Sequence, residues 1–370
     1  MKKYSSLFIF CLGFANFSIA QNTDSLPFDS TLNNQEINFQ DSIANINLAQ
    51  KQLKLSRDAY NEGIQFFELN NFADAINSFN QAIGIDSLFV AAYFNRGVCF
   101  SALSDYDKAI TDFTHTFQLD STNFLVLFKR AEIYRKLNKN GQALSDYQMI
   151  IELDDKNYKS YYEMGVLLFL QNNLEEAIKL YSNSINIKPT ANAYNDRGSC
   201  YRNLEQYDKA IKDYNNATSL EDALAFVYNN LAAIYRITDN TEKALSNYNI
   251  AITKNPDYDI AYNNRGRLYF ELKDISSASS DFDKAISLNP ENALAYNNRG
   301  IIYHKNKDYA TAIADFDKAI SLDENYAKAY LNRGISKQMK RDEDGACADW
   351  KKAFDLGIEL AKKYLMNDCY

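Results

Sequence analysis

Small and apolar residues recur along this chain at a nearly constant interval of 34 residues. Starting from Gly63, each small residue is followed three places later by a large apolar side chain, with Lys337 as the exception. Alanine comes twelve places after the small residue, and an aromatic ring four places after the alanine. Separations of three and four residues place side chains on one face of a helix. The pattern predicts antiparallel helix pairs that approach closely at the small residues.

A fixed interval of this length indicates stacked supersecondary units. The small residues are Gly63, Gly97, Ala131, Gly165, Gly198, Ala232, Gly266, Gly300 and Gly334. One step, near Thr190, has 33 residues instead of 34. We expect nine repeats, over residues 56–89, 90–123, 124–157, 158–190, 191–224, 225–258, 259–292, 293–326 and 327–360.

The start of the chain has a different character. Lys2 and Lys3 precede an apolar run too short to cross a membrane, and small residues follow at Ser18 and Ala20. This order is typical of a cleaved signal peptide over residues 1–20. It predicts an exported protein, periplasmic or extracellular, and no later stretch is long and apolar enough for a transmembrane segment.

Two further segments flank the repeats. Residues 21–55 are polar without a steady period, which predicts a flexible leader that becomes helical near its end. After Gly357, a short amphipathic stretch predicts a capping helix over residues 358–370. Such a helix would cover the last apolar face of a stack.

Composition agrees with helices, because 4 prolines and 12 glycines in 370 residues are too few for a turn-rich β fold. The formal net charge is -8, and no dense run of Lys and Arg offsets it locally. An acidic surface repels phosphate backbones, so nucleic acid is not an expected partner.

The repeated pattern resembles the tetratricopeptide repeat (TPR), with its small eighth residue, aromatic eleventh, alanine twentieth and aromatic twenty-fourth. The resemblance runs from about Ser56 to Leu360 and includes late prolines at Pro189, Pro256 and Pro290. It implies an all-α fold, a right-handed α-solenoid superhelix of nine hairpins, each with a first helix (A) and a second helix (B). It also implies protein binding.

Residues suited to catalysis or metal binding are sparse. His115 and His304 are not near a cysteine or each other at metal-ligand spacing. The sequence has no phosphate-binding glycine-rich loop and no nucleophile elbow. We expect no catalytic residue, no metal, no cofactor and no small-molecule substrate.

Four cysteines follow the predicted signal peptide. Cys99 and Cys200 occupy a core position of their repeats. Cys347 and Cys369 lie ten residues before and twelve residues after Gly357, which corresponds to roughly 15 and 18 Å of helix. In an oxidising compartment they could form a disulfide that holds the cap, and two free thiols are the open alternative.

Arginine precedes the small residue in six repeats, and aspartate precedes the helix-B ring in the same six. The pairs are Arg96 and Asp112, Arg130 and Asp146, Arg197 and Asp213, Arg265 and Asp281, Arg299 and Asp315, and Arg333 and Asp349. Repeats one, four and six lack both residues, which implies that each arginine meets its own aspartate. We predict partly buried ion pairs that fix helix register more than they add stability.

Asparagine fills the sixth place of six repeats, as Asn61, Asn95, Asn230, Asn264, Asn298 and Asn332. In TPR proteins that this chain resembles, including the O-linked N-acetylglucosamine transferases, this residue lines a concave groove and binds the backbone of an extended peptide. An amide suits that role because it both donates and accepts. The alternative is that these asparagines serve packing between repeats.

By the same resemblance, the fifth, ninth and twelfth places face the groove. The fifth place is aromatic in repeats one to four and asparagine in repeats five to eight. Arg135, Arg202 and Arg236 at the twelfth place add positive charge. These features predict a peptide with apolar residues at one end and acidic residues centrally.

The sequence thus predicts an exported scaffold that holds a protein or peptide partner during envelope assembly or secretion. A glycan- or peptidoglycan-binding envelope protein is the alternative. A third option is a solenoid that positions a catalytic partner.

Overall fold

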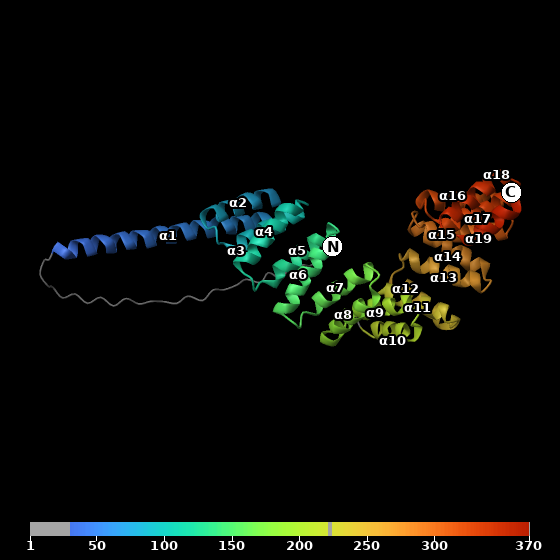
Figure 1. Cartoon of the computed structure of the whole chain (residues 1–370), viewed down its shortest axis with the longest axis horizontal. Helices are drawn as coiled ribbons and strands as arrows, with labels where there is room; N and C mark the ends of the chain where they lie inside the picture. The colour runs from blue at the N-terminus through green and yellow to red at the C-terminus, as the bar shows by residue number, and fades with distance from the viewer. Residues whose placement is uncertain (1–29, 221–223, 370) are drawn as a thin grey trace. The chain divides into compact units, whose positions relative to one another are not determined.

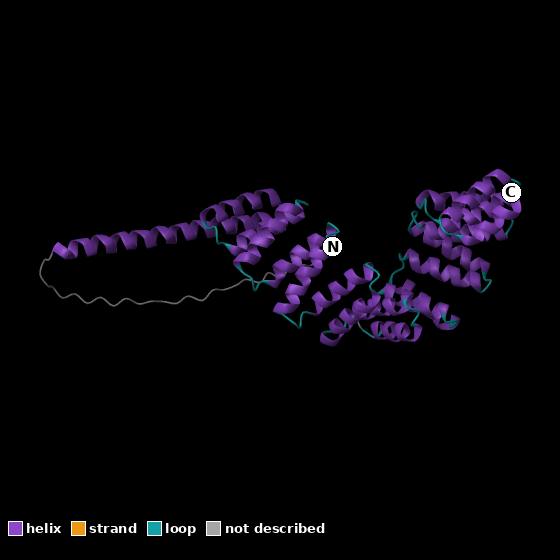
Figure 2. Cartoon of the chain, in the orientation of Figure 1, coloured by secondary structure: helices purple, strands orange, loops and turns teal. Residues whose placement is uncertain are grey.

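The computed structural model describes residues 30–220 and 224–369, and within these ranges all regular structure is α-helical (Figure 2). The chain divides into two compact units, residues 1–99 and 100–370. The helices are labelled in Figure 1. Their bounds are α1 Ser30–Glu68, α2 Phe72–Ile85, α3 Val90–Ala102, α4 Tyr106–Leu119, α5 Phe124–Lys136, α6 Asn140–Leu153, α7 Tyr158–Leu170, α8 Leu174–Ile187, α9 Ala191–Asn203, α10 Tyr207–Thr218, α11 Ala225–Ile237, α12 Thr241–Lys254, α13 Asp259–Glu271, α14 Ile275–Leu288, α15 Ala293–Lys305, α16 Tyr309–Leu322, α17 Ala327–Met339, α18 Glu343–Asp355 and α19 Glu359–Asp368.

Nine tight turns join an A helix to the B helix that follows it. One residue in each turn has a positive φ, between 56° and 64°, although none of the nine is glycine. In the seventh repeat this residue is Lys273, and the next amide, of Asp274, donates to the carbonyl of Tyr269 at 2.9 Å. A left-handed residue of this kind ends a helix and satisfies its last carbonyls. The nine turns confirm the predicted hairpins.

In repeats one, four, five and seven to nine, the hairpin closes around the ring at its twenty-fourth place. In the eighth repeat, Ala312 and Phe316 are fully buried. A Cβ atom added at Gly300 would lie 2.7 Å from Cε1 of Phe316, closer than carbon atoms approach. The small eighth residue is therefore required by the ring that packs on it, which is the physical origin of the sequence pattern.

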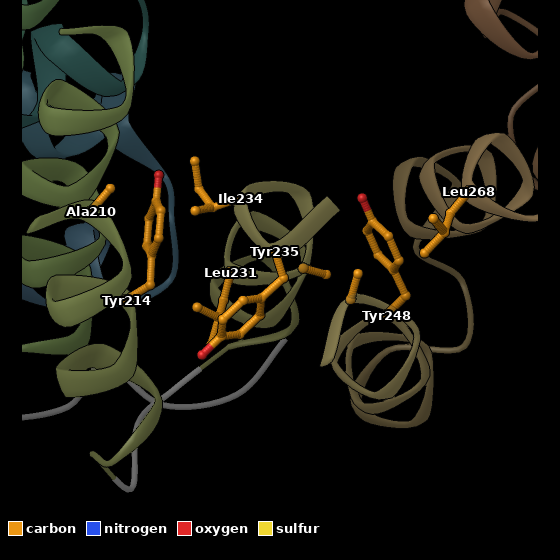
Figure 3. Packing of buried hydrophobic residues seen from close by; sticks show 9 residues of the cluster. Ala210, Tyr214, Leu231, Ile234, Tyr235, Tyr248 and Leu268 are labelled. Atoms are coloured by element: carbon orange, nitrogen blue, oxygen red, sulfur yellow. The ribbon is translucent and has the colours of Figure 1, made fainter. Parts of the chain in front are cut away.

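Apolar cores also link successive repeats. Figure 3 shows one cluster that includes Tyr214 of α10, Leu231 of α11, Tyr248 of α12 and Leu268 of α13. Leu231 stands where six other repeats have arginine, and it is 2% exposed. In the sixth repeat, aliphatic packing thus replaces the polar arrangement used elsewhere.

The N-terminal helix is longer than the sequence analysis predicted. A flexible leader was expected over residues 21–55, whereas α1 is helical from Ser30, which corrects that prediction for most of the segment. No proline or glycine interrupts residues 30–62, so the backbone can propagate as helix. The predicted signal peptide lies outside the described residues.

A short last helix, α19, covers the ninth repeat near the position predicted for the cap. The ring of Tyr364 stacks on Trp350 of α18 with centroids 4.9 Å apart. A disulfide joins Cys347 of α18 to Cys369, directly after α19. Cys99 and Cys200 are free and buried.

Candidate interaction surface

Five of the six predicted Arg–Asp pairs form the same two-bond contact within one hairpin. In the eighth repeat, Nε and Nη2 of Arg299 donate to the two carboxylate oxygens of Asp315 at 2.8 and 2.7 Å. The other four pairs are Arg130 with Asp146, Arg197 with Asp213, Arg265 with Asp281, and Arg333 with Asp349. The five aspartates are only 2–6% exposed. Arg96 and Asp112 belong to different units, so their pairing stays a prediction.

Each of these arginines also reaches back to the preceding repeat, which sequence reasoning missed. Nη1 of Arg299 donates to Asp283 at 2.8 Å, while the Asp315 hydrogen bonds raise the pKa of the Arg299 guanidinium. The sequence does carry a signal for this contact, because a polar residue directly follows the helix-B ring of each preceding repeat. The partners of the other arginines are Asn80, Thr114, Ser182, Asn249 and Asp317.

The exception to the apolar eleventh place also has a physical reason. Nζ of Lys337 lies 2.9 Å from the Asp349 carboxylate, which already accepts from Arg333. In the last full repeat, two cations therefore compensate one buried aspartate.

The asparagines of the fifth and sixth places bind each other between neighbouring A helices. The sixth-place amide nitrogen donates to the fifth-place oxygen of the preceding repeat, at 2.9–3.0 Å. The four bonds run from Asn230 to Asn195, Asn264 to Asn229, Asn298 to Asn263, and Asn332 to Asn297. The fifth-place members are 3–5% exposed. We call this row the amide ladder.

The amide ladder gives the nitrogens of the sixth-place asparagines in repeats six to nine a role in packing between repeats. It also corrects, for repeats five to eight, the expectation that the fifth place faces a partner, because asparagines that are 3–5% exposed are inaccessible. The buried fifth-place amides are satisfied by neighbouring amides, as buried polar groups require. The carbonyl oxygens of Asn230 and Asn332 accept no hydrogen bond from any described residue.

Tyrosine replaces the fifth-place asparagine in repeats one and four. Asn95 donates to the hydroxyl of Tyr60 at 2.8 Å, and Asn61 is exposed. In repeat five the sixth place is Asp196, which accepts from Tyr162 at 2.8 Å and from Asn195 at 2.9 Å. Burial raises the pKa of Asp196, and these two hydrogen bonds oppose the shift.

The predicted positive charge at the twelfth place is mostly compensated. Arg135 forms an ion pair with Glu163 of the next repeat, and Arg236 pairs with Glu271 at 2.8 Å. Arg202 alone of these three has no ion-pair partner among the residues described. A cationic patch suited to an acidic peptide is therefore reduced to one side chain, which corrects the sequence expectation.

The A helices from α7 to α17 contact one another in succession, so their outward residues form one continuous surface. We define the A-helix face as the sixth, ninth and twelfth places of repeats six to nine. All twelve side chains are half-buried or exposed. They are Asn230, Ala233, Arg236, Asn264, Arg267, Phe270, Asn298, Ile301, His304, Asn332, Ile335 and Gln338.

Other chemistry is limited in the part of the chain that the structure describes. Its His, Cys, Asp and Glu side chains form no group of three that could hold a metal ion. Within the same residues, no helix has the length and apolar character needed to span a membrane.

Three tetratricopeptide-repeat profiles match most of the repeated region. One matches residues 60–114 and 128–192, a second residues 191–222 and 293–326, and a third residues 266–307. The chain belongs to the TPR family. Its fold is that of protein–protein interaction scaffolds.

Solved TPR structures are similar to this TPR protein in fold. A chain of the APC/C hetero-tetramer Cut9–Hcn1 has 15% identity and a TM-score of 0.58, over 85% of this chain and 76% of that chain. A TPR protein from Parabacteroides merdae has 21% identity and a TM-score of 0.54, over 66% and 97%. PilF from Pseudomonas aeruginosa has 19% identity and a TM-score of 0.51, over 57% and 97%. No curated protein matched the sequence.

Proposed function

We propose that this TPR protein holds an extended segment of a partner protein on its A-helix face. The observation that carries the proposal is the set of sixth-place amides, one per repeat, whose nitrogens are engaged within the amide ladder. The carbonyl oxygens of Asn230 and Asn332 accept no hydrogen bond from the described residues. Those of Asn264 and Asn298 each accept one long bond, at 3.4 and 3.5 Å, from the neighbouring asparagine and keep a second lone pair. An extended segment has backbone N–H groups to donate at regular intervals. The ladder fixes these acceptors in place, so little conformational entropy is lost on binding.

The neighbouring side chains indicate the character of the segment. Phe270, Ile301 and Ile335 offer apolar contact between the amides. Arg236 is neutralised by Glu271, and Arg267 contacts the same carboxylate at 3.3 Å. A segment with alternating apolar side chains and little net charge fits this surface better than an acidic one.

We further propose that the protein acts outside the cytoplasm, in envelope assembly or secretion. The signal-peptide pattern at residues 1–20 supports export. The disulfide between Cys347 and Cys369 is a second support, because such bonds persist in oxidising compartments. Sequencing of the mature N-terminus should begin at Gln21, and a full-length chain in the cytoplasm would overturn the proposal.

The binding surface is tested by site-specific photocrosslinking. A benzophenone amino acid at Ile301 on the A-helix face should capture a partner in stoichiometric yield, whereas the same group at exposed Lys284 of α14 should not. A synthetic peptide of the captured region should then bind the purified chain and lose affinity on Ile301→Glu, with Lys284→Glu as control. Equal loss in both variants would contradict this surface. Retention on purified cell-wall glycan without protein would favour the glycan-binding alternative.

A further inference from the structure

The N-terminal part of α1 carries aliphatic side chains that its own unit does not cover. We call residues 42–55 the arm. Every arm residue is exposed, and burial of α1 begins at Ser56, whose hydroxyl donates to the carbonyl of Ala82 in α2. Five large aliphatic arm residues have exposed fractions of 43–56%. They are Ile43, Ile46, Leu48, Leu53 and Leu55.

An isolated helix of this length is marginal in water, and helices are normally stabilised by packing of an apolar face. The spacing of the arm residues indicates what packs there. Ile43, Ile46, Gln50 and Leu53 alternate in steps of three and four, which keeps them on one seam of a coiled coil. A helix with the same repeat is the matching partner, and a second copy of this chain supplies one.

The distribution of charge selects the direction of pairing. From Ser42 to Arg57 the sequence has three bases, Lys51, Lys54 and Arg57, and no acid. Parallel copies would bring six bases together. Antiparallel copies that cross near residue 48 instead place Lys51 of one helix at the level of Asn45 of the other, and Lys54 at the level of Ser42, so the bases are kept apart.

We propose that two copies of this chain form a dimer through antiparallel α1 helices that cross near residue 48. In this register Ile43 of one copy lies at the level of Leu53 of the other, and Ile46 at the level of Gln50. Leu53 and Arg57 also line a hollow of about 310 Å3 together with Leu88 and Phe89. The second copy's Ile43 reaches the mouth of this hollow and extends the apolar contact onto the first repeat.

A bilayer surface fits the arm less well than a second helix. Membrane-surface helices place their apolar residues on one face and their charges on the other. Here Leu48 and Leu55 lie on the side of the helix opposite Ile46 and Leu53, at the angles that a 3.6-residue turn gives. Binding to anionic vesicles by a chain that stays monomeric would count against the dimer.

The dimer is tested by sedimentation velocity on the full chain. We expect twice the monomer mass of 42.4 kDa, less any cleaved signal peptide. Ile46→Lys with Leu53→Lys should raise the dimer Kd by at least about 100-fold, because four aliphatic side chains leave the seam per dimer. Asn45→Lys with Gln52→Lys adds the same charge at the same spacing away from the seam and should preserve the dimer. A monomeric parent chain, or equal effects of the two double variants, would overturn the proposal.

The antiparallel direction of the two α1 helices is tested by measuring the distance between spin labels in the dimer. Each chain carries one label on a cysteine that replaces Glu62, in a Cys11→Ser background. Cys99 and Cys200 are buried and the other two described cysteines are bonded, so the added thiol reacts selectively. Antiparallel helices crossing at residue 48 separate the two labels by 28 residues, or about 42 Å along the axis. Parallel helices would hold them within roughly 20 Å. The short distance would contradict the antiparallel dimer.

Discussion

The Arg–Asp contacts make a quantitative prediction, because their two members have different access to water. Asp315 is 6% exposed and accepts two hydrogen bonds from Arg299, whose side chain is 20% exposed. Arg299→Met removes both bonds and leaves a buried carboxylate without a counter-charge. Asp315→Leu leaves an arginine that can turn to water and keep its contact with Asp283.

These differences give three expected losses of stability. Arg299→Met should cost about 3 kcal/mol, the low end for breaking a buried pair, because the site is at the edge of the hairpin. Asp315→Leu should cost about 1 kcal/mol. The double variant should cost about 1–2 kcal/mol, since apolar residues replace a buried ion pair with little penalty. Repeat six illustrates this natural replacement with Leu231.

Urea unfolding measures these losses through the fluorescence of Trp350, the single tryptophan of the chain, which is buried one repeat away. Its signal reports on the C-terminal repeats, which matters because repeat arrays can unfold in parts. The expected order is the Arg299→Met variant below the double variant, with a coupling of about 2–3 kcal/mol. If Arg299→Met is no less stable than the double variant, the buried carboxylate is not the cause.

Three further predictions concern other features. Burial raises the pKa of Asp196 above its ordinary 3.8, so the folded chain binds this proton more tightly than the unfolded chain and stability falls as pH rises through the raised pKa. Asp196→Asn should therefore raise the urea midpoint at pH 7 and leave it unchanged below pH 3.8; a lower midpoint at pH 7 would contradict this. Gly334→Ala should lower the free energy of unfolding by about 1–3 kcal/mol, because the added Cβ would lie 2.5 Å from the indole of Trp350. Gly84→Ala, where an added Cβ has no atom within 4 Å, should be neutral or stabilising. Similar urea midpoints for the two variants would refute the close packing of glycine on the ring. Removing the disulfide by Cys347→Ser with Cys369→Ser should lower the free energy of unfolding by about 3 kcal/mol, because the bond closes a loop of 22 residues. It should also weaken the near-ultraviolet circular dichroism of the stacked indole. Unchanged stability would show that the capping helix stays in place without the disulfide.

The fold was predictable because its periodicity repeats nine times. In repeats one, four, five and seven to nine, the glycine at the eighth place and the ring sixteen places later meet directly, so these repeats encode their own closest contact. Arginine and aspartate are either both present or both absent in each repeat. This co-occurrence predicted contacts such as that of Arg265 with Asp281, because residues that are lost together are expected to touch. The length of α1 was not predicted, because its arm lacks the repeat pattern.

The candidate site was less predictable than the fold. The composition of the sixth place was read correctly as a row of amides, but sequence does not show whether an amide faces solvent or the next helix. The buried fifth place was the missing information: Asn263 reads as polar and therefore exposed, yet its oxygen is the acceptor for Asn298. The prediction of a cationic patch failed for a similar reason, because Glu271, which neutralises Arg236, comes from a neighbouring repeat.

The backward contact of each arginine makes the junctions between repeats unequal. In five of the six repeats whose seventh residue is arginine, one guanidinium binds both its own hairpin and the hairpin before it. At the entry to repeats four and six, Met164 and Leu231 replace it. The directional contacts at these two junctions come from other residues, such as Arg135 with Glu163 and Asn230 with Asn195. These two junctions therefore lack the bond by which a single guanidinium joins two hairpins. The longest run of junctions that keep this bond extends from repeat six to repeat nine.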